Sequence, residues 1–541
     1  MNFKRICSMS TAVVVAISLL AGCGSTSGNT SDKTESSVKS TETRQSAQAS
    51  EAKGPYTLKM LYTSAGPNSP IGESNFKKIE QETGVKMEVT LAPSANYNEK
   101  LQITFASGDM PDVVLFNDVN DVNLKANVEN GNIIDINPYL QNAPNLMQWT
   151  LPESWKAVEY KGDDKKYLIV RSTLVRGDGF EVRKDWLDKL NIKVEDGKPV
   201  TLEQFTDILK RFSQDDPDGN GKNDTYGLHT SVNPDGDFVP LYSSFLNTDI
   251  LGGAFGLTGW QKTTGEDYEY MDPKFSKKTD KFKKFLEYLS MVYQNKYADP
   301  DWAVMKDSQA HDNFVKGKYG VRARFPGHVK PDLDLIKKVN PEGDLIWISG
   351  IINPEAGKVT GLTYSSGAWG GFAVTRSSKK PDRVIEAFDY MLSDEFYADY
   401  SLYGGEGIGF TLADGKRIPT EEYKNPDPGH GIAWWPLIRR AKDVNVFLSL
   451  TLDETFKPRV EGWLKTAVDN AVISLDMGYV PKAALDPKFI DYKKRMSETI
   501  ANIILGQAPS GAYDEAIAGW YENGGEAYVK EMNDYIKANN K

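Results

Sequence analysis

Cysteine is almost absent from this chain of 541 residues, which contains only Cys7 and Cys23. Cys7 precedes a short apolar run, residues 11–20, and Cys23 follows shortly after that run. The run is too short to cross a bilayer as a helix of about 20 residues, so it is typical of a signal peptide, expected at residues 1–22. Cleavage before Cys23 would leave no pair for an intramolecular disulfide, and the stability of the exported protein would have to come from its core.

Histidine is also scarce, and the motifs of several enzyme classes are missing. The four histidines, His229, His311, His328 and His430, are scattered, with neither a His-Glu-x-x-His zinc motif nor a Gly-x-Ser-x-Gly elbow. The segment 405–409 fails the dinucleotide-binding pattern because its third glycine comes one residue too early. We therefore expect no enzymatic activity and predict no catalytic residues. A glycosidase stays open as an alternative, since two carboxylates suffice and the chain has 75 acidic residues.

Positive charges are outnumbered, with 64 Lys and Arg against 75 Asp and Glu, and further long apolar runs are lacking. The formal net charge is −11, and it becomes two charges more negative if Lys4 and Arg5 leave with the signal peptide. This balance argues against nucleic acid as a partner. No second long apolar run follows Cys23, so we expect no membrane-spanning segment after it. Residues 24–53 are mostly Ser, Thr, Gly, Ala, Gln, Glu and Lys, and this composition predicts a flexible tether over residues 23–53.

Strand and helix patterns alternate in the first folded part of the chain. Residues 56–62 and 85–89 alternate between apolar and polar side chains, as half-buried strands do, and 113–116 is a continuous apolar run. Helical patterns lie between them at residues 76–82 and 97–105. This alternation indicates a parallel sheet packed against helices, which is the signature of an α/β fold.

Later segments predict further helices. Thr201 begins a capping box, and Pro381 stands where a first-turn proline is expected ahead of an apolar stripe. Trp186 and Trp463 have apolar neighbours at helical spacing, which predicts that both pack in a core. The chain from residue 458 onward has a mostly helical pattern.

Short motifs follow one another along the chain at Tyr97-Asn98-Glu99-Lys100-Leu101, Ser107-Gly108-Asp109-Met110-Pro111-Asp112, Arg183-Lys184-Asp185-Trp186-Leu187, Asp216-Pro217-Asp218-Gly219-Asn220-Gly221-Lys222-Asn223-Asp224, Tyr403-Gly404-Gly405-Glu406-Gly407 and Gly525-Glu526-Ala527-Tyr528. They stand behind Leu20-Ala21-Gly22-Cys23, which is similar to the lipobox of bacterial lipoproteins, where the cysteine is acylated. With these motifs in this order, the chain resembles the extracellular solute-binding proteins of ABC importers. It is most similar to the LplA-like lipoproteins, which include the alginate-binding proteins. The resemblance implies that Cys23 is lipidated.

The resemblance also implies a periplasmic-binding-protein-like fold of two α/β lobes joined by hinge crossovers, with a helix-rich second lobe. Lobe 1 is expected at residues 54–168 and 360–405, and lobe 2 at 169–359 and 406–541. An oligosaccharide, with uronate units as one option, would bind in the cleft between the lobes and pass to the permease subunits of an importer. The protein would be a monomer, held by its lipid on the extracellular face of the cell membrane. A surface sugar-binding adhesin is the alternative that would share the tether and the aromatic residues.

The segment 216–224 is similar to an EF-hand loop, so Ca²⁺ is the expected cofactor, in a structural role. Oxygen donors stand at the loop positions that ligate calcium, namely Asp216, Asp218, Asn220, the backbone carbonyl of Lys222, and Asp224. Gly221 supplies the sharp turn, but Gly227 stands where the full loop has a bidentate Glu. Coordination would have to be completed by water or by a carbonyl. A plain turn rich in Asp, Asn and Gly is the alternative interpretation.

Aromatic residues are plentiful, with 11 Trp and 26 Tyr. Some of them lie in loop-like segments, where a ring can stack on the C–H face of a sugar, and these are the predicted ligand-binding residues Tyr364, Trp369, Trp434 and Trp435. Arg322 and Arg324 alternate along a predicted strand, and their planar forks would suit the carboxylate of a uronic acid. Core packing of the aromatic rings and structural ion pairs of the arginines are the alternatives.

Overall fold

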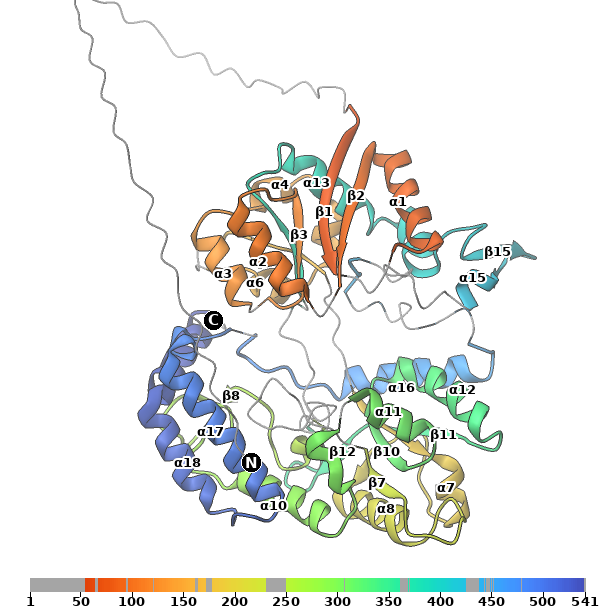
Figure 1. The fold of residues 1–541 in the computed structure, drawn as a ribbon, viewed down its shortest axis with the longest axis vertical. Coiled ribbons are helices and arrows are strands. Elements are labelled where there is room, and N and C mark those ends of the chain that lie inside the picture. Colours follow the sequence, from red (N-terminus) through yellow and green to blue (C-terminus); the bar gives the residue numbers. More distant parts are fainter. Residues whose placement is uncertain are drawn as a thin grey trace, which may run out of the picture. The chain divides into compact units, whose positions relative to one another are not determined.

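The computed structural model has a folded body that spans Gly54–Lys541 (Figure 1). It describes residues 54–63, 67–93, 96–119, 121–160, 164–171, 178–229, 250–305, 307–360, 368, 370–424, 437–441, 443, 448, 450, 452–477 and 479–539. The predicted signal peptide, the lipidation site at Cys23 and the tether lie outside these residues. Within the described ranges, no helix combines the length and the apolar character that crossing a bilayer requires.

The first sheet has five strands in the order β2-β1-β3-β14-β4. The strands are β1 (Tyr56–Thr63), β2 (Val85–Ala92), β3 (Val113–Phe116), β4 (Ile169–Val170) and β14 (Gly371–Val374). β1 pairs in parallel with both β2 and β3, which confirms the predicted parallel arrangement of the first three strands. β14 runs antiparallel to β3 and to β4.

Helices connect these strands as the sequence predicts. Helix α1 (Pro70–Thr83) begins earlier than the expected pattern because Ser69 caps it, with its side chain accepting from the backbone N–H of Gly72 at 3.0 Å. It ends at Gly84, whose φ of 66° is the left-handed conformation that glycine adopts at little cost. Figure 1 shows α1 beside β2 and α2 (Tyr97–Ser107) beside β3.

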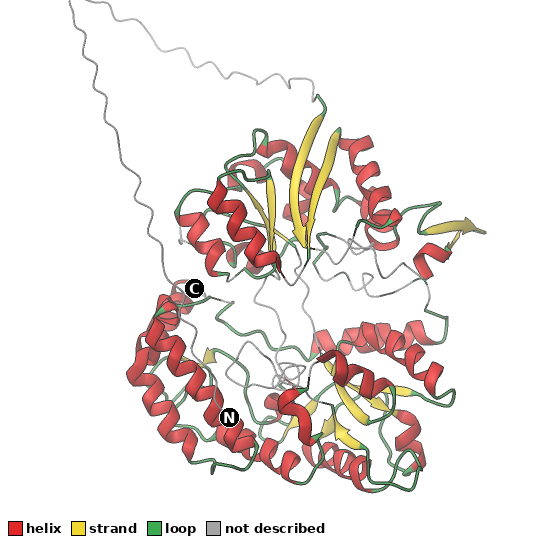
Figure 2. Cartoon of the chain, viewed as in Figure 1, coloured by secondary structure: helices red, strands yellow, loops and turns green. Residues whose placement is uncertain are grey.

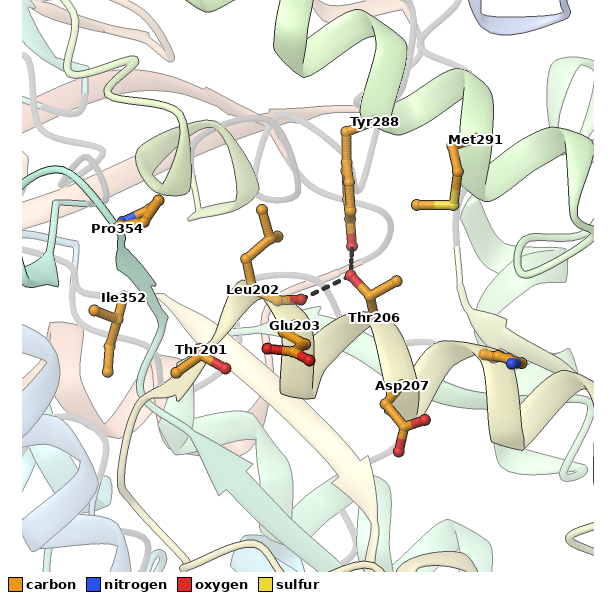
Figure 3. Close-up of a pocket in the computed structure, with 10 residues that line it drawn as sticks. Thr201, Leu202, Glu203, Thr206, Asp207, Tyr288, Met291, Ile352 and Pro354 are labelled. Atoms are coloured by element: carbon orange, nitrogen blue, oxygen red, sulfur yellow. Dashed lines mark hydrogen bonds between the residues drawn. The ribbon is translucent and has the colours of Figure 1, made fainter.

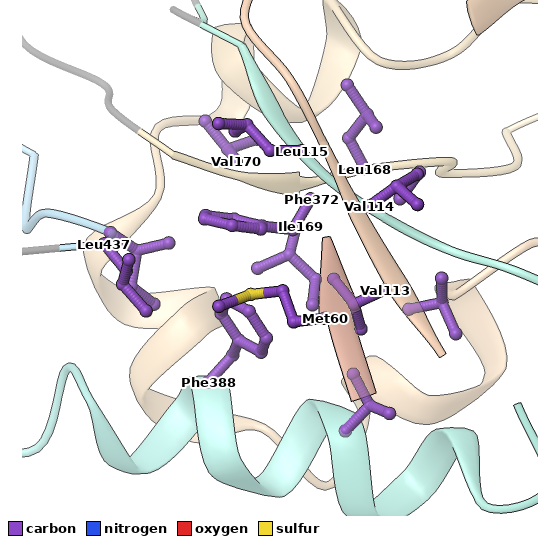
Figure 4. Close-up of a cluster of buried hydrophobic side chains, with 14 of the residues drawn as sticks. Met60, Val113, Val114, Leu115, Leu168, Ile169, Val170, Phe372, Phe388 and Leu437 are labelled. Carbon is purple, nitrogen blue, oxygen red and sulfur yellow. The ribbon is translucent and has the colours of Figure 1, made fainter. Parts of the chain in front are cut away.

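The core of this first part is built from both faces of the sheet. Met60, Val113, Phe372 and Phe388 are fully buried, and Figure 4 shows their side chains gathered with Leu437. Phe388 comes from α13 (Pro381–Tyr390), which begins at the expected first-turn proline. The other elements of this part are α3 (Val122–Glu129), α4 (Asn137–Leu140), α5 (Pro144–Trp149), α6 (Pro152–Lys156), α14 (Asp394–Phe396), the π-helix η4 (Tyr397–Ser401), β15 (Phe410–Ala413), β16 (Lys416–Pro419) and α15 (Glu421–Lys424).

A second sheet has four strands in the order β11-β5-β10-β7. The strands are β5 (Gly179–Arg183), β7 (Tyr226–Leu228), β10 (Tyr319–Arg324) and β11 (Leu345–Ile348). β5 runs antiparallel to β10 and β11, whereas β7 is parallel to β10. A smaller sheet pairs β12 (Ile351–Asn353) with β6 (Val200–Thr201) and β13 (Lys358–Val359). A separate hairpin joins β8 (Gln261–Lys262) and β9 (Tyr270–Met271).

Helices make up most of the remaining structure (Figure 2). The predicted capping box is confirmed, since the backbone N–H of Gln204 donates to Oγ1 of Thr201 and the N–H of Thr201 donates to Oε1 of Gln204, both at 3.1 Å. Trp186 and Trp463 are buried, as their helical spacing predicts. The helices are α7 (Lys184–Lys189), α8 (Leu202–Gln214), α10 (Lys281–Gln294), η2 (Pro300–Val304), α11 (Asp307–Val315), η3 (Pro326–His328), α12 (Val329–Val339), α16 (Phe456–Asp469), η6 (Lys482–Leu485), α17 (Pro487–Ile504), α18 (Ala512–Trp520), η7 (Tyr521–Gly525) and α19 (Glu526–Asn539).

The packing of buried side chains shows where the chain passes from one core to another. Ile169 and Val170 still pack in the core of the first sheet, and Phe180 is the first residue of the second core. Leu437 and Ile438 also belong to the first core, whereas Leu448 packs in a third cluster with α16. The lobe boundaries that the sequence predicts stay a prediction.

Candidate functional site

The carboxyl ends of the parallel strands meet at one edge of the first sheet. β1 ends at Thr63, β3 at Phe116 and β4 at Val170. β14 begins at this same edge, because Gly371 pairs with both Phe116 and Val170. In open α/β sheets, ligands bind just beyond the carboxyl ends of the strands. This edge is therefore a candidate binding site.

Arg171 stands at this edge, directly after β4, and is held from several sides. Its Nη2 donates to the hydroxyl of Tyr62 at 3.2 Å, and its Nη1 donates to Oδ1 of Asn117 at 3.4 Å. The guanidinium carbon lies 5.9 Å from the centroid of the Tyr62 ring. The backbone N–H of Arg171 donates to the carbonyl of Gly370, and its own carbonyl accepts from the N–H of Arg439, both at 3.1 Å. The position of this side chain is therefore fixed by the fold.

Tyr62, Asn117 and Arg171 form a group that we call the edge cluster. Tyr62 is buried and stacks on Phe372 with 6.1 Å between ring centroids, Arg171 is partly exposed, and Asn117 is exposed. Among the described residues, no carboxylate forms an ion pair with Arg171. The cluster thus presents a positive charge and a hydrogen-bonding amide at one edge of the sheet, and the buried ring of Tyr62 packs against the guanidinium.

Further polar residues follow β3 along the chain. Burial lowers the pKa of Lys125, and the negative charge of Asp118 opposes that shift. Burial also raises the pKa of Tyr160 well above its usual value, and the charges of Asp118 and Asp121 raise it further. The carboxylate of Asp121 caps α3 by accepting from the N–H of Asn123 at 2.7 Å. Charged groups of both signs therefore lie near the end of β3.

Arg322 and Arg324, which the sequence offers as ligand-binding residues, converge on one carboxylate. Nη1 of Arg322 and Nε of Arg324 each donate to Oδ2 of Asp332 at 2.9 Å. Nη2 of Arg324 and the ring nitrogen Nε2 of His311 lie 3.3 Å and 3.1 Å from Oδ1 of the same residue. Glu181 lies opposite Arg322 on β5. The contacts of these arginines are those of a structural ion-pair cluster, and a role in binding ligand stays a prediction.

The two acidic residues of this cluster differ in protonation. Burial raises the pKa of Glu181 well above its usual value, and the negative charge of Asp332 raises it further. Burial would also raise the pKa of Asp332, but the hydrogen bond from His311 and the charges of Arg324 and Arg322 hold it well below its usual range. The pKa values of the two carboxyl groups are therefore shifted in opposite directions, which favours the proton on Glu181 and the negative charge on Asp332.

The loop at 216–224 brings three carboxylates around one amide. The Nδ2 of Asn220 donates to Oδ2 of Asp218 at 2.7 Å and to Oδ1 of Asp224 at 3.0 Å. The backbone N–H groups of Asn220 and Gly221 donate to the two carboxylate oxygens of Asp216, each at 3.0 Å. In this hydrogen-bonded arrangement, no group of three or more His, Cys, Asp or Glu side chains in the described part of the chain is set up to hold a metal ion.

A groove of about 700 Å³ opens between α8, α10 and β12. Figure 3 shows Tyr288 and Thr206 pointing toward each other across it, with 3.0 Å between their hydroxyl oxygens. Its other lining residues are Thr201, Leu202, Glu203, Asp207, Lys210, Met291, Ile352 and Pro354. The groove contains none of the residues that the sequence predicts for ligand binding.

Comparison with known proteins decides the family. Residues 75–418 match the family described as bacterial extracellular solute-binding protein. The chain belongs to this family. Two relatives of this solute-binding protein come from Bacillus subtilis (strain 168). The polygalacturonan/rhamnogalacturonan-binding protein YtcQ is 24% identical over 476 residues, which cover 86% of this chain and 89% of YtcQ. Lipoprotein LipO is 27% identical over 495 residues, which cover 88% of this chain and 91% of LipO.

Solved structures give the same assignment at the level of the fold. The structure of the alginate-binding protein AlgQ2 without calcium ion is similar with a TM-score of 0.64 and 19% identity, and it covers 90% of this chain and 99% of AlgQ2. The predicted α/β class with a periplasmic-binding-protein-like fold is thereby confirmed. The resemblance to solute-binding lipoproteins, which the sequence motifs indicate, is confirmed at the level of the family as well.

The remaining predicted ligand-binding residues of this solute-binding protein, Tyr364, Trp369, Trp434 and Trp435, lie outside the described residues. The edge cluster is the group that sequence reasoning missed. A signal for it exists, because Asn117 directly follows the apolar run of β3 and Tyr62 lies near the end of β1. The rule that ligands bind beyond the carboxyl ends of parallel strands would have selected both positions.

Proposed function

We propose that this solute-binding protein captures an oligosaccharide and delivers it, chemically unchanged, to the permease of an ABC importer. The edge cluster is the observation that carries the proposal. Asn117 and Arg171 place hydrogen-bonding groups side by side at the edge where α/β sheets bind ligands, and the hydroxyl of the buried Tyr62 accepts from Arg171. Fixed polar groups of this kind bond the hydroxyls of a sugar.

The relatives support a carbohydrate as the ligand. YtcQ, which is named for binding polygalacturonan and rhamnogalacturonan, matches most of this chain and most of its own length. AlgQ2, an alginate-binding protein, has the same fold over 99% of its chain. A fold of this kind binds its ligand without a covalent step, and hinge closure is the motion that it uses.

A carrier fits the buried acids better than a glycosidase does. Glu181 and Asp332 have pKa values shifted in opposite directions, which is the pattern of a general acid and its partner carboxylate. However, Glu181 is 0% exposed, and the guanidinium groups of Arg322 and Arg324 cover Asp332. No glycosidic bond can reach either carboxyl group. We therefore interpret the pair as part of the fold of a protein that is not an enzyme.

We further propose that the protein is attached to the extracellular face of the cell membrane through a lipid on Cys23, with residues 24–53 as a tether, and that it acts as a monomer. The support comes from Leu20-Ala21-Gly22-Cys23, from the composition of the segment behind it, and from the lipoprotein LipO among the relatives. A tether of this composition would let the folded body move above the membrane while it searches for ligand. A surface adhesin would need the same anchor, so the anchor alone does not separate import from attachment.

We also propose that the 216–224 loop binds a calcium ion. Burial raises the pKa of Asp218, and the nearby charges of Asp216 and Asp224 raise it too, so the three carboxylates repel one another. A divalent cation would relieve that repulsion, and carboxylate, amide and carbonyl oxygens are the ligands that Ca²⁺ prefers. Asp216, Asp218, Asn220, Asp224 and the carbonyl of Lys222 would hold it. Asp216 has φ 48° and Gly221 φ 76°, so the backbone turns sharply at this loop. Calcium there would brace the connection between α8 and β7.

The test of the proposed function is a ligand screen followed by product analysis. The full-length protein is heated with a panel of neutral and acidic oligosaccharides, and a true ligand raises the melting temperature by mass action. At a ligand concentration of 100 times Kd, the free energy of unfolding rises by about 2.7 kcal/mol. Mass spectrometry after long incubation should find the bound sugar intact. Cleavage that disappears in a single carboxylate variant would show an enzyme instead. Growth on the ligand that does not depend on a permease would favour the adhesin.

A further inference from the structure

Arg171 differs from the arginines of the second sheet because no described carboxylate pairs with its charge. Arg183 forms an ion pair with Asp185, and both Arg322 and Arg324 form ion pairs with Asp332. The partners of the Arg171 guanidinium are instead two neutral oxygens, the hydroxyl of Tyr62 and Oδ1 of Asn117. A fixed positive charge with neutral partners is an incomplete arrangement that an external anion can complete.

The donors of Arg171 are only partly used. A guanidinium has five N–H groups in a planar fork, and the contacts to Tyr62 and Asn117 take one group on each terminal nitrogen. The backbone of Arg171 is held by Gly370 and Arg439, so the side chain starts from a fixed point. The residue as a whole is partly exposed. A bidentate acceptor would therefore meet a fork that is already oriented, which reduces the entropy lost on binding.

We propose that Arg171 binds the carboxylate of an acidic oligosaccharide, so that the protein prefers uronate-containing ligands to neutral ones. The inference rests on the proposed function and narrows its substrate class. A planar carboxylate matches the guanidinium fork, whereas the exposed amide of Asn117 suits the hydroxyls of the same sugar unit.

This inference moves the recognition of the acid away from Arg322 and Arg324. Their side chains already share Asp332, and a ligand carboxylate would have to compete with that residue at distances of 2.9 Å. Arg171 has no such competitor among the described residues. The binding of a uronate carboxylate, which the sequence suggests for the arginines of β10, is therefore available to Arg171 at the edge of the first sheet.

The experiment compares trigalacturonate, trimannuronate, the methyl ester of trigalacturonate and the neutral galactotriose by titration calorimetry with the full-length protein. The ester removes the charge and keeps the sugar. Arg171→Gln should weaken binding of the preferred uronate roughly 10- to 150-fold, the usual range for hydrogen bonds to a charged group, and should bind acid and ester alike. Arg171→Lys keeps the charge but loses the planar fork, so its affinity for the uronate should lie between that of the wild type and that of Arg171→Gln. Arg495→Gln, which removes the same charge from an exposed site on α17, is the matched control.

Thermal melts must first show that the variants are folded. If the wild type binds the ester or galactotriose as well as either acid, or if Arg171→Gln keeps the preference for the acid, the assignment of Arg171 is wrong while carbohydrate capture stands. If none of the four sugars binds, both the assignment and its premise are overturned for this ligand class. Tyr62→Phe, which removes one anchor of the guanidinium, should reduce the preference for the acid by less than Arg171→Gln does.

Discussion

Arg322 and Glu181 lie directly opposite each other in the antiparallel pair of β10 and β5, yet Arg322 gives its short contact to a third residue. Its Nη1 lies 2.9 Å from Oδ2 of Asp332 and 3.5 Å from Oε1 of Glu181. Within the described structure, neither carboxyl oxygen of Glu181 has a hydrogen-bond donor. The cross-strand neighbour Glu181 is thus the weaker partner of Arg322, and burial raises its pKa well above the usual value.

Replacing Glu181 by Gln should therefore increase stability above acidic pH. An unfolded Glu loses its proton near pH 4.5, whereas folded Glu181 keeps its proton to higher pH, so the folded state binds more protons between these two values. The free energy of unfolding of the wild type falls as pH rises through that window, and a glutamine, which cannot ionise, has no such dependence. The gain in melting temperature of Glu181→Gln over wild type should grow from pH 4.5 upward.

Calorimetric melts between pH 4 and pH 8 check this sign. Glu203→Gln makes the same chemical change on the exposed side of α8 and should show no growing difference. A variant that becomes less stable than wild type as pH rises would mean that Glu181 is ionised and paired with Arg322. Asp332 contributes in the opposite sense, because its lowered pKa gives stability that is present above pH 3.8 and is lost on acidification.

Removal of calcium should lower the melting temperature. A chelator removes the ion that the 216–224 loop is proposed to hold, and the three carboxylates then repel one another again. Magnesium should restore stability poorly, since the smaller ion requires a tighter octahedron. Asp218→Ala should make the melting temperature independent of the chelator, whereas Asp334→Ala, a carboxylate change on the exposed face of α12, should leave the dependence intact. A wild-type protein that ignores the chelator would leave the loop as a plain turn.

The sequence could predict the parts of this fold that depend on neighbours in the chain. The capping box of Thr201 involves residues three apart, and α13 begins at Pro381 for equally local reasons. The apolar stripe of α2 puts Tyr97 and Leu101 in the core, as its spacing predicts. Local patterns of this kind need no knowledge of tertiary contacts.

The edge cluster could not be predicted in the same way. Arg171 is 109 residues from Tyr62 and 54 residues from Asn117, and β4 and β14 bring it to the edge only through their pairing in the sheet. The same holds for Glu181, which lies beside the Arg322 and Asp332 pair because β5 pairs with β10. A pattern of residue types along the chain does not say which strands become neighbours. The partners of Arg171 and Arg322 could therefore not be predicted from it.

Lipidation of Cys23 should be lost in Cys23→Ala. The motif Leu20-Ala21-Gly22-Cys23 offers one thiol for acylation, and alanine has none. Metabolic labelling with a radioactive fatty acid should label the wild-type protein but not Cys23→Ala, and that variant should leave the membrane fraction. Cys7→Ala is the matched control, because Cys7 belongs to the segment that cleavage removes and should not affect the label. Retained label and an unchanged membrane fraction in Cys23→Ala would contradict the prediction.

Trp434 and Trp435 are predicted to contribute to sugar binding. This prediction depends on the sequence alone, because both residues lie outside the described part of the chain. A ring that stacks on a bound sugar should cost about ten- to several-hundred-fold in affinity when it is removed, the usual scale for aromatic anchors. Adjacent side chains of an extended segment point to opposite sides, so Trp434→Ala and Trp435→Ala should weaken binding by different factors.

Calorimetric titration with the ligand found in the screen measures both variants, and Trp463→Ala separates loss of a contact from loss of the fold. Trp463 is 3% exposed and packs on Trp347 with 6.3 Å between ring centroids, so its removal should lower stability by about 3–5 kcal/mol. The variants Trp434→Ala and Trp435→Ala should keep the wild-type melting temperature without ligand, because a ring that stacks on a sugar stabilises the complex and not the core. If both loop variants melt early and bind normally, these tryptophans are core residues, and sugar recognition depends on the edge cluster instead.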